Sequence, residues 1–202
     1  MTQPERVEMS SRRLVEAAAE LIAEKGWEAA TAAEIGRRAG YSRAMVHARY
    51  GGKELLLDAL FEAEYRRMLS ITPAVDATGL DQALALLDRV DVLLRTDPDL
   101  MRAMFVLGFE AVKTTSPARP RVHGLFAESV RVAESGLRRG IRDGSVRPDV
   151  DVRRVANDIC EAPFGIAFRW LVMPERYDPR KQLAHIRARI VDDCGPRTAR
   201  RS

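Results

Sequence analysis

Two short helices joined by a very tight turn constrain this chain more than any other feature. Thr31 and Glu34 have the spacing of a capping box, in which each side chain accepts a hydrogen bond from the backbone N–H of the other residue, so a helix is predicted to begin there. Gly40 is suited to end that helix because glycine adopts a left-handed conformation at little cost. Ser42, a favourable N-cap, opens a second helix almost at once. Residues 31–50 therefore predict a helix-turn-helix.

Positive charge is concentrated in the same stretch. Residues 35–53 contain five Lys or Arg residues and one histidine but no Asp or Glu, although the net charge of the whole chain is only +4. A helix-turn-helix places its second helix in the major groove of DNA, and clustered cations neutralise the phosphates beside it. The pattern predicts a DNA-binding element. The alternative is a solvated basic face on an ordinary helical hairpin, which would not account for caps, turn and charge together.

Residues 12–61 resemble the DNA-binding domain of TetR-family transcriptional regulators. The features that carry the resemblance are Gly26-Trp27, Thr31, Ile35-Gly36, Ala39-Gly40, Ser42, Tyr50 and Lys53. Three positions depart from the family pattern: His47 stands where Tyr is usual, Arg49 where His is frequent, and Tyr41 where a small aliphatic residue is common. We expect these differences to alter which operator is bound. The resemblance implies an all-α fold, with an N-terminal three-helix helix-turn-helix domain and a C-terminal helical domain for ligand binding and dimerisation.

Nine residues are predicted to contact DNA. Those expected at base edges are Arg43, Ala44, Met45 and Ala48, and those expected at the sugar-phosphate backbone are Thr31, His47, Arg49, Tyr50 and Lys53. Arg43 follows the N-cap directly, where a recognition helix enters the groove deepest, and its forked guanidinium suits guanine. For Tyr50, a place in the hydrophobic core is an equal alternative.

Helical periodicity continues along the chain on both sides of this stretch. We expect residues 1–9 to form a disordered arm, followed by an amphipathic helix that Gly26 ends. A fourth helix, residues 55–69, leads out of the first domain. The predicted domains are residues 10–70, which bind DNA, and residues 80–195, which bind an effector and dimerise.

The longest apolar helix is expected from residue 151 onward, and it has two apolar stripes. The second stripe comprises Cys160, Phe164, Phe168 and Leu171. Because a monomer would leave such a stripe exposed, we predict a homodimer through residues 151–194. Pro163 should kink this helix, since proline removes a backbone donor and clashes with the preceding turn.

Methionine and phenylalanine cluster in the second half of the chain and predict a pocket for a small, largely apolar effector. The candidate lining is Met101, Arg102, Met104, Phe105, Phe109, His123, Phe126, Phe164 and Phe168. Arg102 or His123 would be the polar group that orients the ligand. A plain hydrophobic core is the more frequent explanation for such spacing, although methionine tolerates the irregular walls of an adaptable pocket.

Several classes of protein are disfavoured. The three histidines stand far apart and the sequence has no metal-ligand spacing, phosphate-binding loop or nucleophile elbow, so we expect no enzyme, no metal and no cofactor. The two cysteines are interpreted as small buried residues. No stretch approaches the roughly 20 apolar residues of a membrane span and no signal peptide is recognisable, which favours a cytoplasmic protein. We therefore expect a repressor that an effector releases from operator DNA; a helical adaptor, or an enzyme whose site forms only in the fold, is the alternative.

Overall fold

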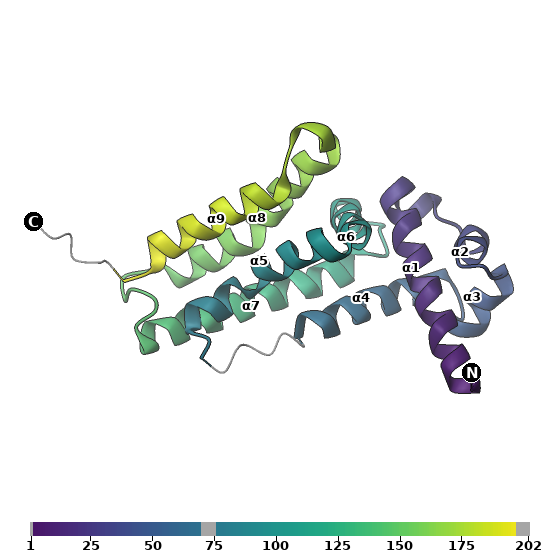
Figure 1. Cartoon of the computed structure of the whole chain (residues 1–202), viewed down its shortest axis with the longest axis horizontal. Helices are drawn as coiled ribbons and strands as arrows, with labels where there is room; N and C mark the ends of the chain where they lie inside the picture. Colours follow the sequence, from purple (N-terminus) through teal and green to yellow (C-terminus); the bar gives the residue numbers. More distant parts are fainter. Residues whose placement is uncertain (1, 70–75, 197–202) are drawn as a thin grey trace, which may run out of the picture. The chain divides into compact units, whose positions relative to one another are not determined.

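The computed structural model describes the backbone of residues 2–69 and 76–196, and the side chains of residues 2–62 and 76–196. The described residues form helices and no strand, which confirms the all-α prediction (Figure 1). The helices are α1 (Gln3–Ala29), α2 (Ala32–Arg38), α3 (Arg43–Tyr50), α4 (Lys53–Leu69), α5 (Gly79–Thr96), α6 (Pro98–Glu110), α7 (Arg119–Asp143), α8 (Val152–Val172) and α9 (Pro179–Cys194), with a 3-10 turn at Pro174–Arg176.

The helices pack into two compact units that do not follow the predicted division of the sequence. The first unit comprises Met1–Arg67 and Asp97–His123, and the second comprises Met68–Thr96 and Gly124–Ser202. The predicted division places helix α6 in the C-terminal domain, but this helix packs against α1 in the first unit. Each unit is therefore assembled from two separate pieces of chain.

Helix α1 begins earlier than the sequence suggests. Thr2 and Glu5 form a capping box, in which the Thr2 N–H donates to Glu5 Oε2 at 2.7 Å and the Glu5 N–H donates to Thr2 Oγ1 at 3.4 Å. The prediction of a disordered arm is therefore wrong for residues 2–9, while Met1 lies outside the described residues. The helix breaks at Gly26, as predicted, where φ is 82° and ψ is 169°.

The core of the first unit is made by one face from each of the first four helices. Its buried residues are Leu14, Ala17, Ala18, Leu21, Ala30, Ile35, Ala39, Val46 and Leu56. Trp27 is also buried, as expected for a residue that pins the end of α1. Because these side chains come from α1 to α4, the two short helices of the helix-turn-helix are stabilised by packing on a common apolar core and not by their intrinsic helix stability.

In the second unit, α5 and α7 approach until their backbones touch. A Cβ atom added at Gly79 would lie 2.0 Å from the backbone nitrogen of Gly140, and one added at Gly136 would lie 2.5 Å from that of Ala83. Real Cβ atoms cannot come so close, so the crossing requires residues without side chains at these positions.

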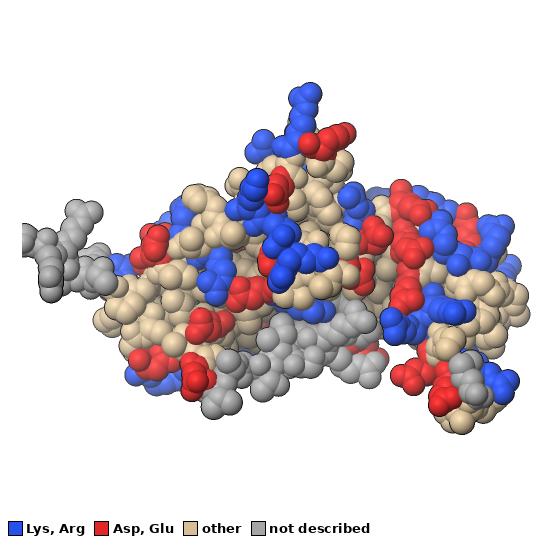
Figure 2. All heavy atoms as spheres, viewed as in Figure 1, with Lys and Arg blue, Asp and Glu red and all other residues tan. Residues whose placement is uncertain are grey.

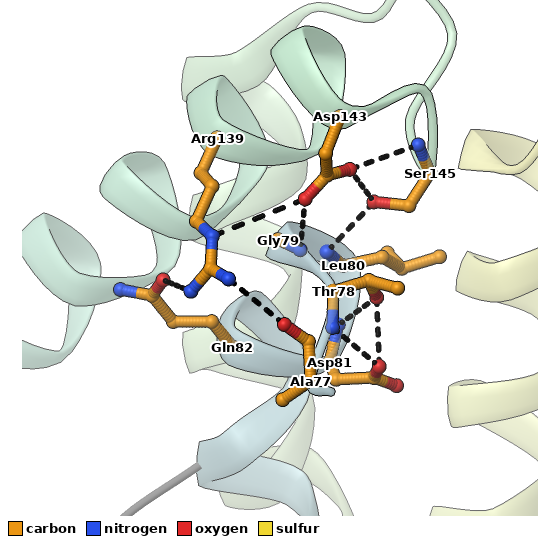
Figure 3. A network of polar contacts seen from close by, with 9 residues as sticks. All are labelled: Ala77, Thr78, Gly79, Leu80, Asp81, Gln82, Arg139, Asp143 and Ser145. Carbon is orange, nitrogen blue, oxygen red and sulfur yellow. Dashed lines mark hydrogen bonds and ion pairs between the residues drawn. The ribbon is translucent and has the colours of Figure 1, made fainter. Parts of the chain in front are cut away.

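A network of polar contacts fastens the beginning of α5 to the end of α7 (Figure 3). The Gly79 N–H donates to Asp143 Oδ2 at 2.8 Å, and the Leu80 N–H donates to Ser145 Oγ at 3.2 Å. Arg139 reaches across from α7 and donates to the carbonyl of Ala77 at 2.9 Å. Orphan N–H groups at a helix start need such partners, and here α7 and the turn after it supply them.

Helix α8 packs beside α9 in the second unit (Figure 1). The apolar stripe of α8 that contains Ala156, Ile159 and Ile166 is buried. Pro163 is buried within a helix that continues as one element from Val152 to Val172. Both cysteines are buried and unpaired, in agreement with their interpretation as small core residues.

Candidate nucleic-acid interface

The capping box that predicts α2 is present. The Glu34 N–H donates to Thr31 Oγ1 at 3.2 Å, and the Thr31 N–H donates to Glu34 Oε2 at 3.1 Å. Lys25 of α1 lies 2.6 Å from the other carboxylate oxygen. Hydrogen bonds from Lys25 and then from Thr31 lower the pKa of Glu34 to about 2. The start of α2 is thus fixed both locally and to α1.

The turn after α2 is closed by backbone hydrogen bonds. The Tyr41 N–H donates to the carbonyl of Gly36 at 2.7 Å, and the Gly40 N–H donates to that of Arg37 at 3.1 Å. Ser42 occupies the N-cap position of α3 with extended backbone angles, although its side chain makes no capping hydrogen bond. Helices α2 and α3 therefore form the predicted helix-turn-helix.

The side chains of α3 divide into an inner and an outer face. Val46 is fully buried, and Met45 and Tyr50 are half-buried against the same core. Arg43, Ala44, His47 and Ala48 are exposed, as is Thr31 at the start of α2. The outer face thus presents one forked cation, one imidazole and two methyl groups, which are suited to base edges and phosphates.

The last turn of α3 is tied to α1. Arg49 Nε donates to Ser10 Oγ at 2.9 Å, and the Tyr50 hydroxyl donates to the carbonyl of Ser11 at 3.0 Å. Burial raises the pKa of Tyr50, partly offset by its hydrogen bond to Ser11. Because the Tyr50 hydroxyl donates its one proton within the protein, packing describes this residue better than phosphate contact. Ser10 and Ser11 were missed by sequence reasoning because they adjoin the segment predicted to be disordered.

Lys53 has a partner within the protein. Its Nζ donates to the backbone carbonyl of Trp27 and lies 4.1 Å from the centroid of the indole ring. The Trp27 N–H in turn donates to a carboxylate oxygen of Glu110 in α6 at 3.1 Å. Burial of the ammonium group lowers the pKa of Lys53. A cation at the start of α4 is therefore explained without a phosphate, although an ammonium group has further N–H donors to offer one.

One cation of the predicted run is engaged elsewhere. Arg38 contacts Glu24 of α1 through two hydrogen bonds of 2.7 and 3.0 Å, and Glu20 through one of 3.1 Å. The hydrogen bond with Arg38 holds the pKa of Glu24 below its usual value. Arg38 thus braces α2 against α1 rather than facing DNA alone.

A large groove in the first unit has, among the described residues, seven acidic side chains and a single basic one, Arg12, in its lining. It has a volume of about 920 Å³, and its lining includes Glu8, Glu16 and Glu20 of α1 with Asp58 and Glu62 of α4. Figure 2 shows acidic side chains as a band over α1. This surface would repel phosphate, so the exposed face of α3, a helix without any Asp or Glu, is the candidate face for DNA.

The predicted effector-binding residues fall into both units. In the first unit, Met101 and Phe105 are buried on α6, Arg102, Met104 and Phe109 are half-buried, and His123 is exposed. In the second unit, Phe126 and Phe164 are half-buried with ring centroids 5.8 Å apart, whereas Phe168 is 61% exposed. Phe168 and His123 thus lie on the surface of the single chain, which corrects their assignment to an interior lining.

Comparison with known proteins agrees with the helix-turn-helix geometry. Residues 14–60 match the model of the family described as bacterial regulatory proteins, tetR family. This match assigns residues 14–60 to the TetR-type DNA-binding domain. The match begins in α1 and ends in α4, so it covers the four helices that share the core of the first unit.

Similarity to individual TetR-family proteins extends over most of the chain. A fatty acid metabolism regulator protein of Bacillus subtilis (strain 168) is 21% identical over 169 residues, which is 82% of this chain and 86% of that protein. The TetR family protein CprB from S. coelicolor A3(2) has a TM-score of 0.75 at 24% identity, covering 96% of this chain and 93% of its own. FadR from Bacillus subtilis in complex with stearoyl-CoA has a TM-score of 0.72 at 21% identity, covering 89% and 97%. These likenesses show that the fold of both units is shared.

The matched family is one of bacterial regulatory proteins, so residues 14–60 form the DNA-binding domain of a regulator of this kind. Among the described residues, no helix is both long enough and apolar enough to cross a bilayer.

Proposed function

We propose that this chain is a TetR-family repressor, and that a small, largely apolar effector releases its homodimer from operator DNA. The observation that carries the DNA-binding part is the division of α3, which buries Val46 in the core and exposes Arg43, Ala44, His47 and Ala48 on one surface. A helix so divided can enter a major groove while its inner face stays packed.

The proposed contacts follow from exposure and chemistry. Arg43, in the first turn of α3, would donate two parallel hydrogen bonds to a guanine, and Ala44 and Ala48 would contact thymine methyl groups. Thr31, His47, Arg49 and Lys53 would contact phosphates, which position the protein without reading sequence. Met45 is half-buried, so its exposed edge would contribute an apolar contact at the groove wall.

The proposed dimer surface is the outer face of α8 together with α9, within residues 151–194. In the single chain, Phe168 is 61% exposed, Val172 62% and Met173 46%. Soluble monomers rarely expose neighbouring large apolar side chains, whereas a two-fold interface would bury them. A two-fold axis would also present two α3 helices to successive major grooves, roughly 34 Å apart.

The proposed effector is apolar because the lining predicted from the sequence consists mainly of aromatic and thioether side chains; in the second unit, the Phe126 and Phe164 rings lie 5.8 Å apart. Arg102 is the candidate for orienting a polar end of the ligand. FadR from Bacillus subtilis was solved in complex with stearoyl-CoA, a ligand that has a long acyl chain, and this supports an apolar class of ligand. An effector shifts DNA binding only by its difference in affinity for the two conformations, so a change from 1:99 to 99:1 requires roughly 5.5 kcal/mol.

The DNA-binding proposal is tested by selecting genomic fragments that the purified protein retains and measuring affinity for them by fluorescence anisotropy. Arg43→Ala should cost about 1 to 3 kcal/mol and relax preference at one base pair. The matched control is Arg12→Ala, which removes the same charge from the acidic groove, where Arg12 pairs with Glu16. Equal losses of sequence preference in both variants would contradict the assignment of α3 as the recognition helix.

The effector proposal is tested by a thermal-shift screen of apolar compounds. We expect some stabilising compounds to release operator DNA, and Phe105→Ala to abolish that release while leaving the affinity of the ligand-free protein for DNA unchanged. Compounds that stabilise the protein yet leave operator affinity unaltered would show that their site is not regulatory.

A further inference from the structure

The beginning of α1 and the end of α3 meet at a pair of adjacent serines. The Ser10 hydroxyl accepts a hydrogen bond from Arg49, and the backbone carbonyl of Ser11 accepts one from the Tyr50 hydroxyl. Neither the capping boxes nor the apolar core requires these contacts, because Leu14 and the buried alanines after it already fix α1 to the other helices.

Ser10 is unusual because its hydroxyl is buried in the middle of a helix. Among the residues whose side chains are described, only Ser10 and Ser116 are both polar and buried, and Ser10 is 3% exposed. Its hydroxyl donates to the carbonyl of Val7 at 2.9 Å and accepts from Arg49 Nε at 2.9 Å, so both of its functions are used. Alanine at position 10 would favour the helix more and would bury no polar group. Helix stability therefore does not explain why a serine stands at this position.

The contact determines which donors Arg49 has left. A guanidinium group carries five N–H donors in one fixed plane, and Ser10 occupies the single donor on Nε. Within residues 2–62 and 76–196, the two Nη atoms make no hydrogen bond or ion pair. Fixing Nε fixes the plane, so the end-on pair of Nη groups is presented as a ready-made fork for two oxygens of one phosphate.

We propose that Ser10 is a positioning residue for DNA binding: its buried hydroxyl aims the guanidinium of Arg49 at a backbone phosphate, which makes the start of α1 part of the DNA interface. This inference rests on the proposed role of α3 as the recognition helix. A cation in the last turn of a helix also favours the helix dipole, but that effect acts on the charge of Arg49 and needs no buried hydroxyl.

The experiment uses the full-length protein and labelled duplex DNA of random sequence, because phosphate contacts are independent of sequence and no operator is needed. Ser10→Ala should weaken binding about 3- to 10-fold, the loss expected when a charge-assisted contact is loosened but not removed. Ser11→Ala is the matched control, since Ser11 contributes only its carbonyl to Tyr50. Ser10→Thr, which keeps the hydroxyl, should restore binding.

A double-mutant comparison separates positioning from folding. Ser10→Ala should have no further effect on DNA affinity in an Arg49→Ala background, because the group that it positions is gone. Thermal melting of each variant gives the structural readout, and a merely structural role would lower the melting temperature without weakening DNA binding in the cold. The proposal is overturned if Ser10→Ala binds as tightly as Ser11→Ala, or weakens binding by the same factor without Arg49. If the wild-type protein does not bind duplex DNA, the proposed function itself fails.

Discussion

Replacing Gly26 by alanine should destabilise the protein in two ways, through backbone strain and through the loss of a hydrogen bond to α6. Its backbone angles, φ 82° and ψ 169°, lie in a region that is essentially restricted to glycine and that costs other residues about 1 to 3 kcal/mol. The new Cβ atom would also lie 2.4 Å from Glu110 Oε1. The carboxylate would have to leave the Trp27 N–H, and a hydrogen bond to a charged group contributes about 1.5 to 3 kcal/mol.

The expected loss for Gly26→Ala is therefore about 2.5 to 6 kcal/mol, a large fraction of the typical stability of a domain. Urea unfolding followed by circular dichroism measures it. Gly40→Ala is the matched control, because φ is 80° at Gly40 but no atom lies within 4 Å of its added Cβ. In that variant only backbone strain should appear, about 1 to 2 kcal/mol.

A second arm isolates the contact with α6. In a Glu110→Ala background, Gly26→Ala should cost only its backbone part, because the clash and the hydrogen bond are already gone. If Gly26→Ala loses no more stability than Gly40→Ala, or loses the same amount with and without Glu110, then the contact between Glu110 of α6 and the end of α1 does not stabilise the first unit as expected.

Three further predictions concern other parts of the chain. The depressed pKa of Glu34, about 2 against 4.5, means that its stabilising effect is complete above pH 4.5 and lost as pH falls toward 2, so the melting temperatures of wild type and Glu34→Gln should converge over that range; a constant gap would contradict it. Gly136→Ala should destabilise by about 1 to 3 kcal/mol, because its Cβ would lie 2.5 Å from the Ala83 backbone, whereas Gly124→Ala, in open space, should not destabilise; equal melting temperatures would exclude the close crossing. Phe168→Glu should shift sedimentation from dimer to monomer, and an unchanged dimer would exclude the outer face of α8 as the interface.

Local signals in the sequence predicted the helix-turn-helix well. The capping box of Thr31 and Glu34 depends on residues three positions apart, and the burial of Val46 follows from its place in a repeating apolar pattern. The early start of α1 was missed although Thr2 and Glu5 have the same capping spacing, because residues 3–9 lack an apolar stripe. Apolar periodicity identifies helices that cover a core. It does not identify the first turns of α1, residues 3–9, which a cap and polar contacts stabilise.

The partners of the charged residues could not be predicted. Lys53 and Trp27 are 26 positions apart, and Trp27 and Glu110 are 83 apart, so no pattern in the sequence links them. Arg38 belongs to an acid-free run, yet its partners, Glu20 and Glu24, lie on the preceding helix. A count of charge along the chain therefore identified the candidate surface but overestimated how many of its cations are available to DNA.

The network of polar contacts at the start of α5 has a consequence for the order in which the two units fold during synthesis. The partner of the Gly79 N–H is Asp143, which the ribosome adds 64 residues later, and the apolar side of α5 gains its neighbours α8 and α9 later still. Until α7 is made, Leu80, Leu84 and Leu87 of α5 have no other helix of their own unit to pack against. The piece of chain between them, Asp97–His123, meanwhile completes the first unit. The first unit can thus fold during synthesis before α5 has packed. A chain truncated after residue 123 would contain all residues of the first unit and, inserted between its two pieces, helix α5 with its apolar side exposed.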